Sequence, residues 1–293
     1  MNFRAPGKWI LMGEHAVVRG KGALVFPLSS KELVLHCLER REEQSLSVSA
    51  DSEELETALL KSLQIAEKFL GTKFQQHFRF TVNSSIPLRA GLGSSAALAV
   101  AICEFLVDIK CLPAEKIFSL ALQIENHFHG SSSGIDIAAV SQGRPIYFER
   151  GNPPKIEALS IACPVQFYLS DTELRSSTAE CVKKVIALQR PDLDEQMSHA
   201  VSMGREALAS AEGYAKLKMA MHQARDCFEQ WELFPKEARE AAKKLELAGA
   251  GAVKPTGSGG GGFLVSVWDS IPPADLNLVP AYSFNLLRSE SSE

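Results

Sequence analysis

The chain has 293 residues, 45% of them hydrophobic and 23% charged, which is typical of a globular protein with one large or two medium domains. Its formal net charge of −4 excludes the basic character of most nucleic-acid-binding proteins, and its most apolar window, residues 96–107, is too short to cross a bilayer. The six cysteines form no C-x-x-C pair, so we expect reduced, mostly buried thiols. These features predict a cytoplasmic protein with no nucleic-acid or membrane partner.

Short strands and long helices alternate in the first half of the chain. Alternating apolar residues predict strands at residues 22–29 and 32–40, which could form a hairpin, and further strands at 44–50 and 77–82. Helices are predicted at residues 52–71, 94–108 and 113–127. The first helix has an acidic first turn and ends at a glycine, and the last has a proline at its first position.

Helical patterns dominate after residue 170. They cover residues 176–188, 193–212, 215–229 and 236–247. Strands are predicted before these helices at residues 144–150 and 163–170, and after them at 263–268 and 281–287. Because strands and helices are mixed in both halves, we expect an α+β fold with one domain at residues 1–160 and a second at 161–293.

The segment GLGSSA, residues 91–96, introduces the helix predicted at 94–108. It matches the dinucleotide pattern G-x-G-x-x-A, but a polar loop containing Pro87 separates it from the preceding strand, and no Lys-Ser/Thr pair follows as a Walker motif requires. Glycines let backbone N–H groups converge, and a helix N-terminus adds partial positive charge, so the segment could bind phosphate. A tight structural turn capped by Ser94 or Ser95 would use the same residues.

A second glycine-rich segment, KPTGSGGGG, occupies residues 254–262. Its glycines are more numerous than a hairpin turn needs, and ordering them is costly in backbone entropy. A predicted strand rather than a helix follows, which excludes a dinucleotide motif. Two explanations remain: the loop is pressed against another segment of backbone, or it closely approaches a ligand.

Several polar and charged residues lie in predicted buried strands or beside turns, where they could take part in binding or catalysis. Lys8 falls within a predicted buried strand, where its ammonium needs a carboxylate or a phosphate unless it reaches solvent at the strand end. Glu125 and Asp136 flank a polar loop that can turn both carboxylates toward one pocket, although Glu125 is also typical of a solvated helix residue and Asp136 of a helix start favoured by the dipole. Glu14 and His15 form a polar pair at a predicted turn. Together with the glycine loops, these are the groups that phosphoryl transfer requires.

Three segments resemble the motifs of the GHMP small-molecule kinases. They are APGKWILMGEHAVV (5–18), IPLRAGLGSSAA (86–97) and KPTGSGGGG (254–262), in the family's order and spread over nearly the whole chain. Within this superfamily, GEHAVV followed by GKGALVFPL is similar to mevalonate kinases. The eleven positions separating Glu125 from Asp136 match the spacing between the metal-ligand glutamate and the catalytic aspartate of those enzymes.

The resemblance implies a role for each motif. Asp136 and Lys8 would be catalytic: the aspartate orients and can deprotonate the acceptor hydroxyl, and the lysine keeps that carboxylate ionised and stabilises charge on the γ-phosphate. Ser95 and Glu125 would bind Mg²⁺, with Ser94 as the alternative hydroxyl. The ATP phosphates would lie on Gly91, Leu92, Gly93, Ser94, Ser95 and Ala96. The acceptor would contact Glu14, His15, Arg175, Ser177, Gly257, Ser258 and Gly259, the arginine fork matching a carboxylate.

The implied fold is the two-domain GHMP kinase fold, with an N-terminal ribosomal-protein-S5-domain-2-like domain and a C-terminal ferredoxin-like α/β domain. The implied enzyme uses ATP and Mg²⁺ to phosphorylate the primary hydroxyl of mevalonate, giving 5-phosphomevalonate for isoprenoid biosynthesis, and it could be a homodimer. Pro255 and Ser258 depart from the usual KLTGAGGGG, so phosphomevalonate, a sugar or homoserine stays an alternative acceptor. A non-catalytic nucleotide-binding protein on the same fold is the remaining alternative, and retention of both Lys8 and Asp136 argues against it.

Overall fold

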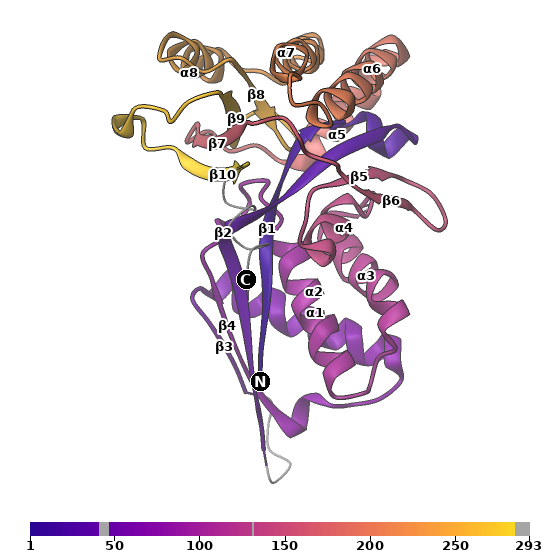
Figure 1. Cartoon of the computed structure of the whole chain (residues 1–293). Coiled ribbons are helices and arrows are strands. Elements are labelled where there is room, and N and C mark those ends of the chain that lie inside the picture. The colour runs from indigo at the N-terminus through magenta and orange to yellow at the C-terminus, as the bar shows by residue number, and fades with distance from the viewer. Residues whose placement is uncertain (41–46, 131, 285–293) are drawn as a thin grey trace. The chain divides into compact units, whose positions relative to one another are not determined.

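The computed structural model describes residues 1–40, 47–130 and 132–284, and the chain divides into two compact units (Figure 1). Unit 1 contains residues 1–8, 31–88 and 92–143. Unit 2 contains residues 9–30, 89–91 and those from 144 onward. Each unit is therefore assembled from separated stretches of the chain, and the domain boundary between residues 160 and 161 stays a prediction.

Unit 1 contains a mixed sheet. Its strands are the first part of β1 (Asn2–Met12), the second part of β2 (Gly22–Glu39), β3 (Ser47–Ala50) and β4 (Phe78–Ser84). β4 lies between β3 and β2. It runs antiparallel to β2, with Leu33 opposite Ser84, and parallel to β3. β3 lies within the predicted strand at 44–50, of which residues 44–46 are outside the described residues.

Four α-helices of the described part of unit 1 lie on one side of this sheet (Figure 1). They are α1 (Glu53–Leu70), α2 (Ser94–Asp108), α3 (Ile117–His129) and α4 (Ile135–Gln142). The Ser52 hydroxyl accepts the Leu55 N–H at the start of α1, and Gly71 ends that helix in the left-handed conformation. α2 is apolar on nearly every side and buries most of its residues, so it forms the centre of this unit's core, where the Phe105 ring meets the Phe80 ring edge to face.

The hairpin expected from residues 22–29 and 32–40 is wrong, because the structure has one continuous strand, β2. Ser29 and Ser30 are exposed, and this polar stretch resembles a turn in the sequence. No glycine or asparagine is present there to adopt the positive φ that a two-residue hairpin turn requires, so the backbone stays extended. The first part of β2 belongs to unit 2 and the second part to unit 1.

Unit 2 contains a four-stranded antiparallel sheet in the order β10-β7-β9-β8. Its strands are β7 (Gln166–Asp171), β8 (Ala252–Thr256), β9 (Phe263–Trp268) and β10 (Val279–Ser283). The first part of β2 pairs separately with β5 (Ile146–Glu149), which pairs with β6 (Lys155–Ala158). In the core, the Trp9 ring stacks on Phe26 at 4.5 Å between centroids and contacts Phe167 at 5.2 Å.

The helices of unit 2 follow the predicted pattern. They are α5 (Thr178–Leu188), α6 (Pro191–Leu208), α7 (Tyr214–Gln230) and α8 (Lys236–Leu247). α6 packs on α7, and α7 and α8 both contact β8, so these helices cover one side of the sheet (Figure 1). Single-turn 3₁₀ helices lie at Ala16–Arg19, Gln75–His77, Ala114–Lys116 and Ala274–Leu276.

The sequence patterns do not predict β6 and β8. β6 is four residues long and partly exposed, so it lacks a clear alternation. β8 contains Pro255, which cannot donate a ladder hydrogen bond, and it lies at the edge of its sheet, where proline is tolerated.

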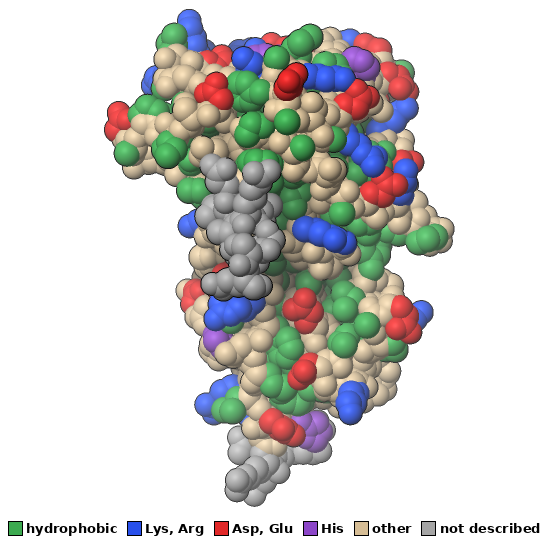
Figure 2. All heavy atoms as spheres, in the orientation of Figure 1, with side chains coloured by type: hydrophobic (Ala, Val, Ile, Leu, Met, Phe, Trp, Pro, Cys, Tyr) green, Lys and Arg blue, Asp and Glu red, His purple; other side chains and the backbone are tan. Residues whose placement is uncertain are grey.

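Charge and thiol placement agree with the composition. On the face drawn in Figure 2, acidic and basic side chains of the described residues are interspersed rather than gathered by sign. All six cysteines are free thiols and five are buried, as the sequence predicts. Across the described ranges, no helix combines the length and apolarity that a membrane span needs.

Candidate active site

Lys8 and Asp136 form an ion pair inside unit 1. The lysine lies in β1 and the aspartate in the first turn of α4, and their Nζ and Oδ1 atoms are 3.0 Å apart. The lysine side chain is only 4% exposed, whereas the aspartate side chain is 24% exposed. A buried ammonium is thus paired with a partly open carboxylate that a small molecule can reach.

The GLGSSA loop lies against Lys8. The Lys8 backbone N–H donates to the Leu92 carbonyl at 2.9 Å, and a Cβ built on Gly93 would come within 2.7 Å of the Lys8 Cγ. Gly93 has a φ of 79° and provides no side-chain cap for α2, whose first turn also lacks an acidic residue. The Ser94 hydroxyl oxygen is buried and has no hydrogen-bond partner among the described residues. The start of α2 therefore keeps the donors that an anion would use.

Glu125 is a buried carboxyl beside this loop. It lies in α3, is 2% exposed, and accepts a hydrogen bond from the Ser95 hydroxyl at 3.1 Å. Burial and the neighbouring charge of Asp136 raise the pKa of Glu125 to about 8, against smaller opposing effects of Ser95 and Lys8. Such a carboxyl gains most from a cation, and Mg²⁺ commonly uses one or two protein carboxylates together with substrate phosphates. The groups present fit that ion, although no cluster of three or more His, Cys, Asp or Glu side chains that could hold a metal occurs in the described residues.

Glu125→Gln is expected to stabilise the cation-free protein at pH 8 but not at pH 4.5. Since the pKa of this carboxyl rises from 4.5 to about 8 on folding, the unfolded state binds fewer protons between these values, and the free energy of unfolding falls as pH rises through that window. The neutral amide removes this loss, which is on the order of a few kcal/mol. Urea unfolding with a chelator at several pH values measures it, with the exposed Glu115→Gln as control. A difference that does not change with pH would contradict the assignment.

The glycine run at residues 257–262 is pressed against other segments of unit 2. Its glycines all have positive φ, and a Cβ on Gly261 would lie 2.9 Å from the backbone of Leu174. A Cβ on Gly259 would come equally close to the Leu233 carbonyl. The Gly262 N–H donates to the Leu174 carbonyl at 2.8 Å, and the Ser176 hydroxyl donates to that of Gly259 at 2.7 Å. Close backbone packing therefore accounts for Gly259 and Gly261, while the contacts of Gly257 and Gly262 leave room for a side chain and do not require glycine by packing.

Gly261→Ala is expected to lower the free energy of unfolding by about 3 kcal/mol or more, because it adds a backbone collision to a strained φ of 150°. Gly20→Ala is the matched control. It also has a positive φ in unit 2, and no described atom lies within 4 Å of its added Cβ, so it should cost only about 1–2 kcal/mol. Denaturant unfolding of both variants compares the two costs. Equal losses would show that φ alone, and not packing on Leu174, requires glycine at 261.

Glu14 and His15 lie in a turn of unit 2 after β1. The Glu14 carboxylate forms a buried ion pair with Lys254, with 2.7 Å between Oε1 and Nζ. His15 has a φ of 58°, and its Nε2 lies 2.9 Å from the Ser258 carbonyl. Burial lowers the pKa of His15 to about 4, with Arg19 adding to the effect, so the ring is neutral at pH 7. Because a carbonyl only accepts, Nε2 carries the proton and Nδ1 is left as an acceptor.

Arg175 and Ser177 lie just before and at the start of α5, also in unit 2. Arg175 is half exposed, and its two terminal nitrogens bind the two oxygens of Asp171, both at 2.8 Å. This pairing lowers the pKa of Asp171. The Ser177 hydroxyl caps α5 by accepting the Glu180 N–H. The arginine fork is therefore oriented in advance, while the serine has a structural role in addition to any role at the acceptor.

Sequence reasoning missed Lys254 and Asp171. Lys254 is fully buried between apolar neighbours in β8, so the argument that singled out Lys8 would have found it too. Asp171 precedes Arg175 by four residues, a spacing that could have indicated the pair.

The structure brings several of the predicted residues together in each unit, whereas Arg175 and Ser177 bind Asp171 and Glu180 instead. Lys8, Gly93, Ser95, Glu125 and Asp136 are neighbours in unit 1. In unit 2, His15 contacts Ser258, and a Cβ on Gly257 would lie 3.7 Å from the Gly91 carbonyl.

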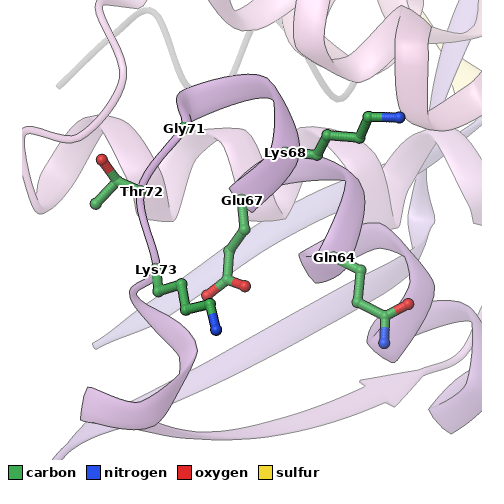
Figure 3. A pocket seen from close by; sticks show the side chains of 6 residues that line it. All are labelled: Gln64, Glu67, Lys68, Gly71, Thr72 and Lys73. Carbon is green, nitrogen blue, oxygen red and sulfur yellow. The ribbon is translucent and has the colours of Figure 1, made fainter.

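A shallow hollow of about 350 Å³ in unit 1 contains none of the predicted site residues. It lies at the C-terminal end of α1, where Gln64, Glu67 and Lys68 project around the turn that leads to Lys73 (Figure 3). Glu67 is already used there, since it accepts the backbone N–H groups of Phe74 and Gln75. The hollow therefore reflects the ending of a helix.

Comparison with known proteins relates the chain to small-molecule kinases. The family described as "GHMP kinases N terminal domain" matches residues 58–144. A mevalonate kinase of Archaeoglobus fulgidus is 31% identical over 281 residues, covering 92% of this chain and 93% of the relative.

Two solved structures have the same fold. The mevalonate kinase of L. major in complex with R-mevalonate matches with a TM-score of 0.79 and 24% identity, covering 94% of this chain and 88% of that one. The phosphomevalonate kinase of Streptococcus pneumoniae in complex with phosphomevalonate and AMPPNP also gives 0.79, with 15% identity over 96% of this chain and 98% of that one. The fold alone therefore does not distinguish between these two acceptors.

Proposed function

The chain belongs to the GHMP kinase family, and on that premise we propose that it transfers the γ-phosphoryl group of ATP to the primary hydroxyl of mevalonate, giving 5-phosphomevalonate and ADP. The observation that carries the proposal is the pairing of Lys8 with Asp136 at 3.0 Å beside the GLGSSA loop, in a chain 31% identical to a mevalonate kinase. The rivals are a kinase of another acceptor, such as phosphomevalonate, a sugar or homoserine, and a non-catalytic nucleotide-binding protein.

The chemistry of the unit 1 residues follows from their placement. Asp136 accepts a hydrogen bond from the acceptor hydroxyl and takes its proton as the oxygen attacks phosphorus. Lys8 holds that carboxylate in place through their ion pair and offsets the negative charge that develops on the transferred group. The N–H groups at the start of α2 bind phosphate oxygens.

Ser95 and Glu125 are the residues that would hold Mg²⁺, with Ser94 as the alternative hydroxyl. When bound, the ion neutralises phosphate charge. Mg²⁺ would also favour the ionised form of Glu125, so the affinity of the protein for Mg²⁺ should rise with pH up to about the pKa of 8 of this carboxyl.

Residues of unit 2 are assigned to the acceptor. Arg175 is oriented by Asp171 and offers its remaining N–H groups to a carboxylate, and His15 offers its unprotonated Nδ1 to a hydroxyl. Glu14 supports the turn that carries His15. Ser177, Gly257, Ser258 and Gly259 are the further residues assigned to this side.

A coupled assay of ADP release tests the proposal. The purified protein is offered ATP and Mg²⁺ with mevalonate, phosphomevalonate, galactose or homoserine, and phosphorus NMR identifies the product. We expect turnover with mevalonate and little with the others. A higher kcat/KM for another acceptor would reassign the substrate, and nucleotide binding without turnover would favour the non-catalytic alternative. Light scattering of the same sample tests the predicted homodimer.

A further inference from the structure

A fully buried lysine lies beside the acceptor-side turn and has no part in the proposed mechanism. Lys254 in β8 is 0% exposed, and its Nζ lies 2.7 Å from Glu14 Oε1. The same ammonium donates to the Pro255 carbonyl and lies 5.0 Å from the centroid of the Phe228 ring. Burial lowers the pKa of this lysine, and the Glu14 carboxylate acts against that shift.

Stability alone does not explain such a pair. Removing two charges from water is costly, and apolar residues of similar size often replace a buried ion pair without loss of stability. A buried pair can instead specify one arrangement of the segments that it joins. Here it joins the turn after β1 to the strand that leads into the glycine run.

The end of β1 and the turn that carries Glu14 are tied to residues 254–258 at two further points. Thr256 Oγ1 donates to the Ile10 carbonyl at 2.8 Å and accepts the Ile10 N–H at 3.0 Å. His15 donates to the Ser258 carbonyl, as described above. Together with the Lys254–Glu14 pair, these contacts form a polar clasp between the end of β1 with its following turn and residues 254–258.

His15 is a part of this clasp that is assigned to the acceptor. Its φ of 58° is a conformation that residues with a side chain rarely adopt, so neighbouring contacts have to maintain it. Its ring meets the edges of Trp231 at 5.2 Å and Phe228 at 6.1 Å. The Phe228 ring thus contacts the Lys254 ammonium and His15 at once, which links the lysine to the imidazole by a second route.

We propose that Lys254 is a positioning residue for the acceptor: through Glu14 and Phe228 it fixes the turn and the ring orientation of His15, and with them the affinity for the acceptor. The acceptor role rests on the proposed function. The geometric part, that Lys254 maintains the His15–Ser258 hydrogen bond, does not.

Paired variants separate positioning from folding. Lys254→Met alone leaves a buried carboxylate and is expected to destabilise the protein. Lys254→Met combined with Glu14→Leu removes both charges, and we expect its thermal stability to return close to that of the wild type. The matched control is Arg225→Met with Glu246→Leu, which removes an ion pair of the same 2.7 Å length between α7 and α8 in the same unit.

The first readout is the titration of the His15 ring, monitored by NMR. The ring signal is assigned by its absence in a His15→Gln variant. In the double variant we expect the pKa of His15 to move from about 4 toward 6.5, because the ring is released from its buried position. In the control variant it should not move. An unchanged titration in the double variant would overturn the proposal, whatever the substrate of the enzyme is.

The second readout is steady-state kinetics with mevalonate and ATP. We expect the double variant to raise KM for mevalonate about tenfold or more, while KM for ATP changes by less than about twofold. A double variant with wild-type KM for mevalonate would show that the pair is structural only. If the wild type itself fails to use mevalonate, the proposed function fails, and the His15 titration still decides whether Lys254 positions that ring.

Discussion

Asp136→Asn is expected to lower kcat for mevalonate phosphorylation by about a thousandfold, because the amide can still accept a hydrogen bond but cannot take the proton of the attacking hydroxyl. The substitution keeps the shape of the side chain, and Lys8 loses its charged partner at 3.0 Å. Nucleotide affinity should change by no more than about threefold, because the phosphate donors at the start of α2 are not altered. ADP release with saturating mevalonate and nucleotide titration in its absence measure the two quantities.

The control for this variant is Asp108→Asn, which alters an exposed aspartate of the same unit at the end of α2. It should leave kcat unchanged. Near-normal turnover by Asp136→Asn would rule out this carboxylate as the general base and would leave it a role in orienting the hydroxyl at most.

Most of the helices and strands were predictable from local sequence patterns. α2 and α8 have the predicted bounds. Gly93 precedes the start of the apolar helix α2, Pro235 precedes the start of α8, and the apolar residues of α8 repeat at helical spacing. The single strand β2 was not predictable from its own residues. Ser29 and Ser30 are exposed where this strand leaves one compact unit and enters the other, and such a polar stretch has the same appearance as a turn.

The residues of the candidate site that were predictable are those whose burial would be costly without a partner. Lys8 stood out because an ammonium in an apolar strand needs a partner, and Asp136 is that partner. The pairing of Asp171 with Arg175 is local, because the two residues are four positions apart, and their spacing could have indicated it. The pairing of Lys254 with Glu14 depends on how distant segments meet, and spacing along the chain carries little information about it. The same holds for Gly259 and Gly261, which are required by neighbouring backbone that no local pattern reveals.

Lys8→Met is expected to lower kcat by about a thousandfold or more, since it removes both the partner of Asp136 and the cation that offsets charge on the transferred phosphoryl group. The methionine stem matches the lysine stem, so packing against Gly93 should persist, and the loss should come from the charge. Lys8→Arg should not restore activity, because the larger guanidinium would have to fit where the lysine side chain is only 4% exposed. Single-turnover measurements with bound ATP and mevalonate separate this effect from substrate binding.

The double variant Lys8→Met with Asp136→Asn tests whether the two residues act as one unit. If the lysine works mainly through its ion pair with the aspartate, the second substitution has little left to remove, and the double variant should be about as slow as the slower single variant. If Lys8 and Asp136 stabilised the reaction independently, their effects would multiply to about a millionfold. A multiplicative loss would contradict the mechanism drawn from the 3.0 Å contact, and it would assign the lysine to the phosphoryl group alone.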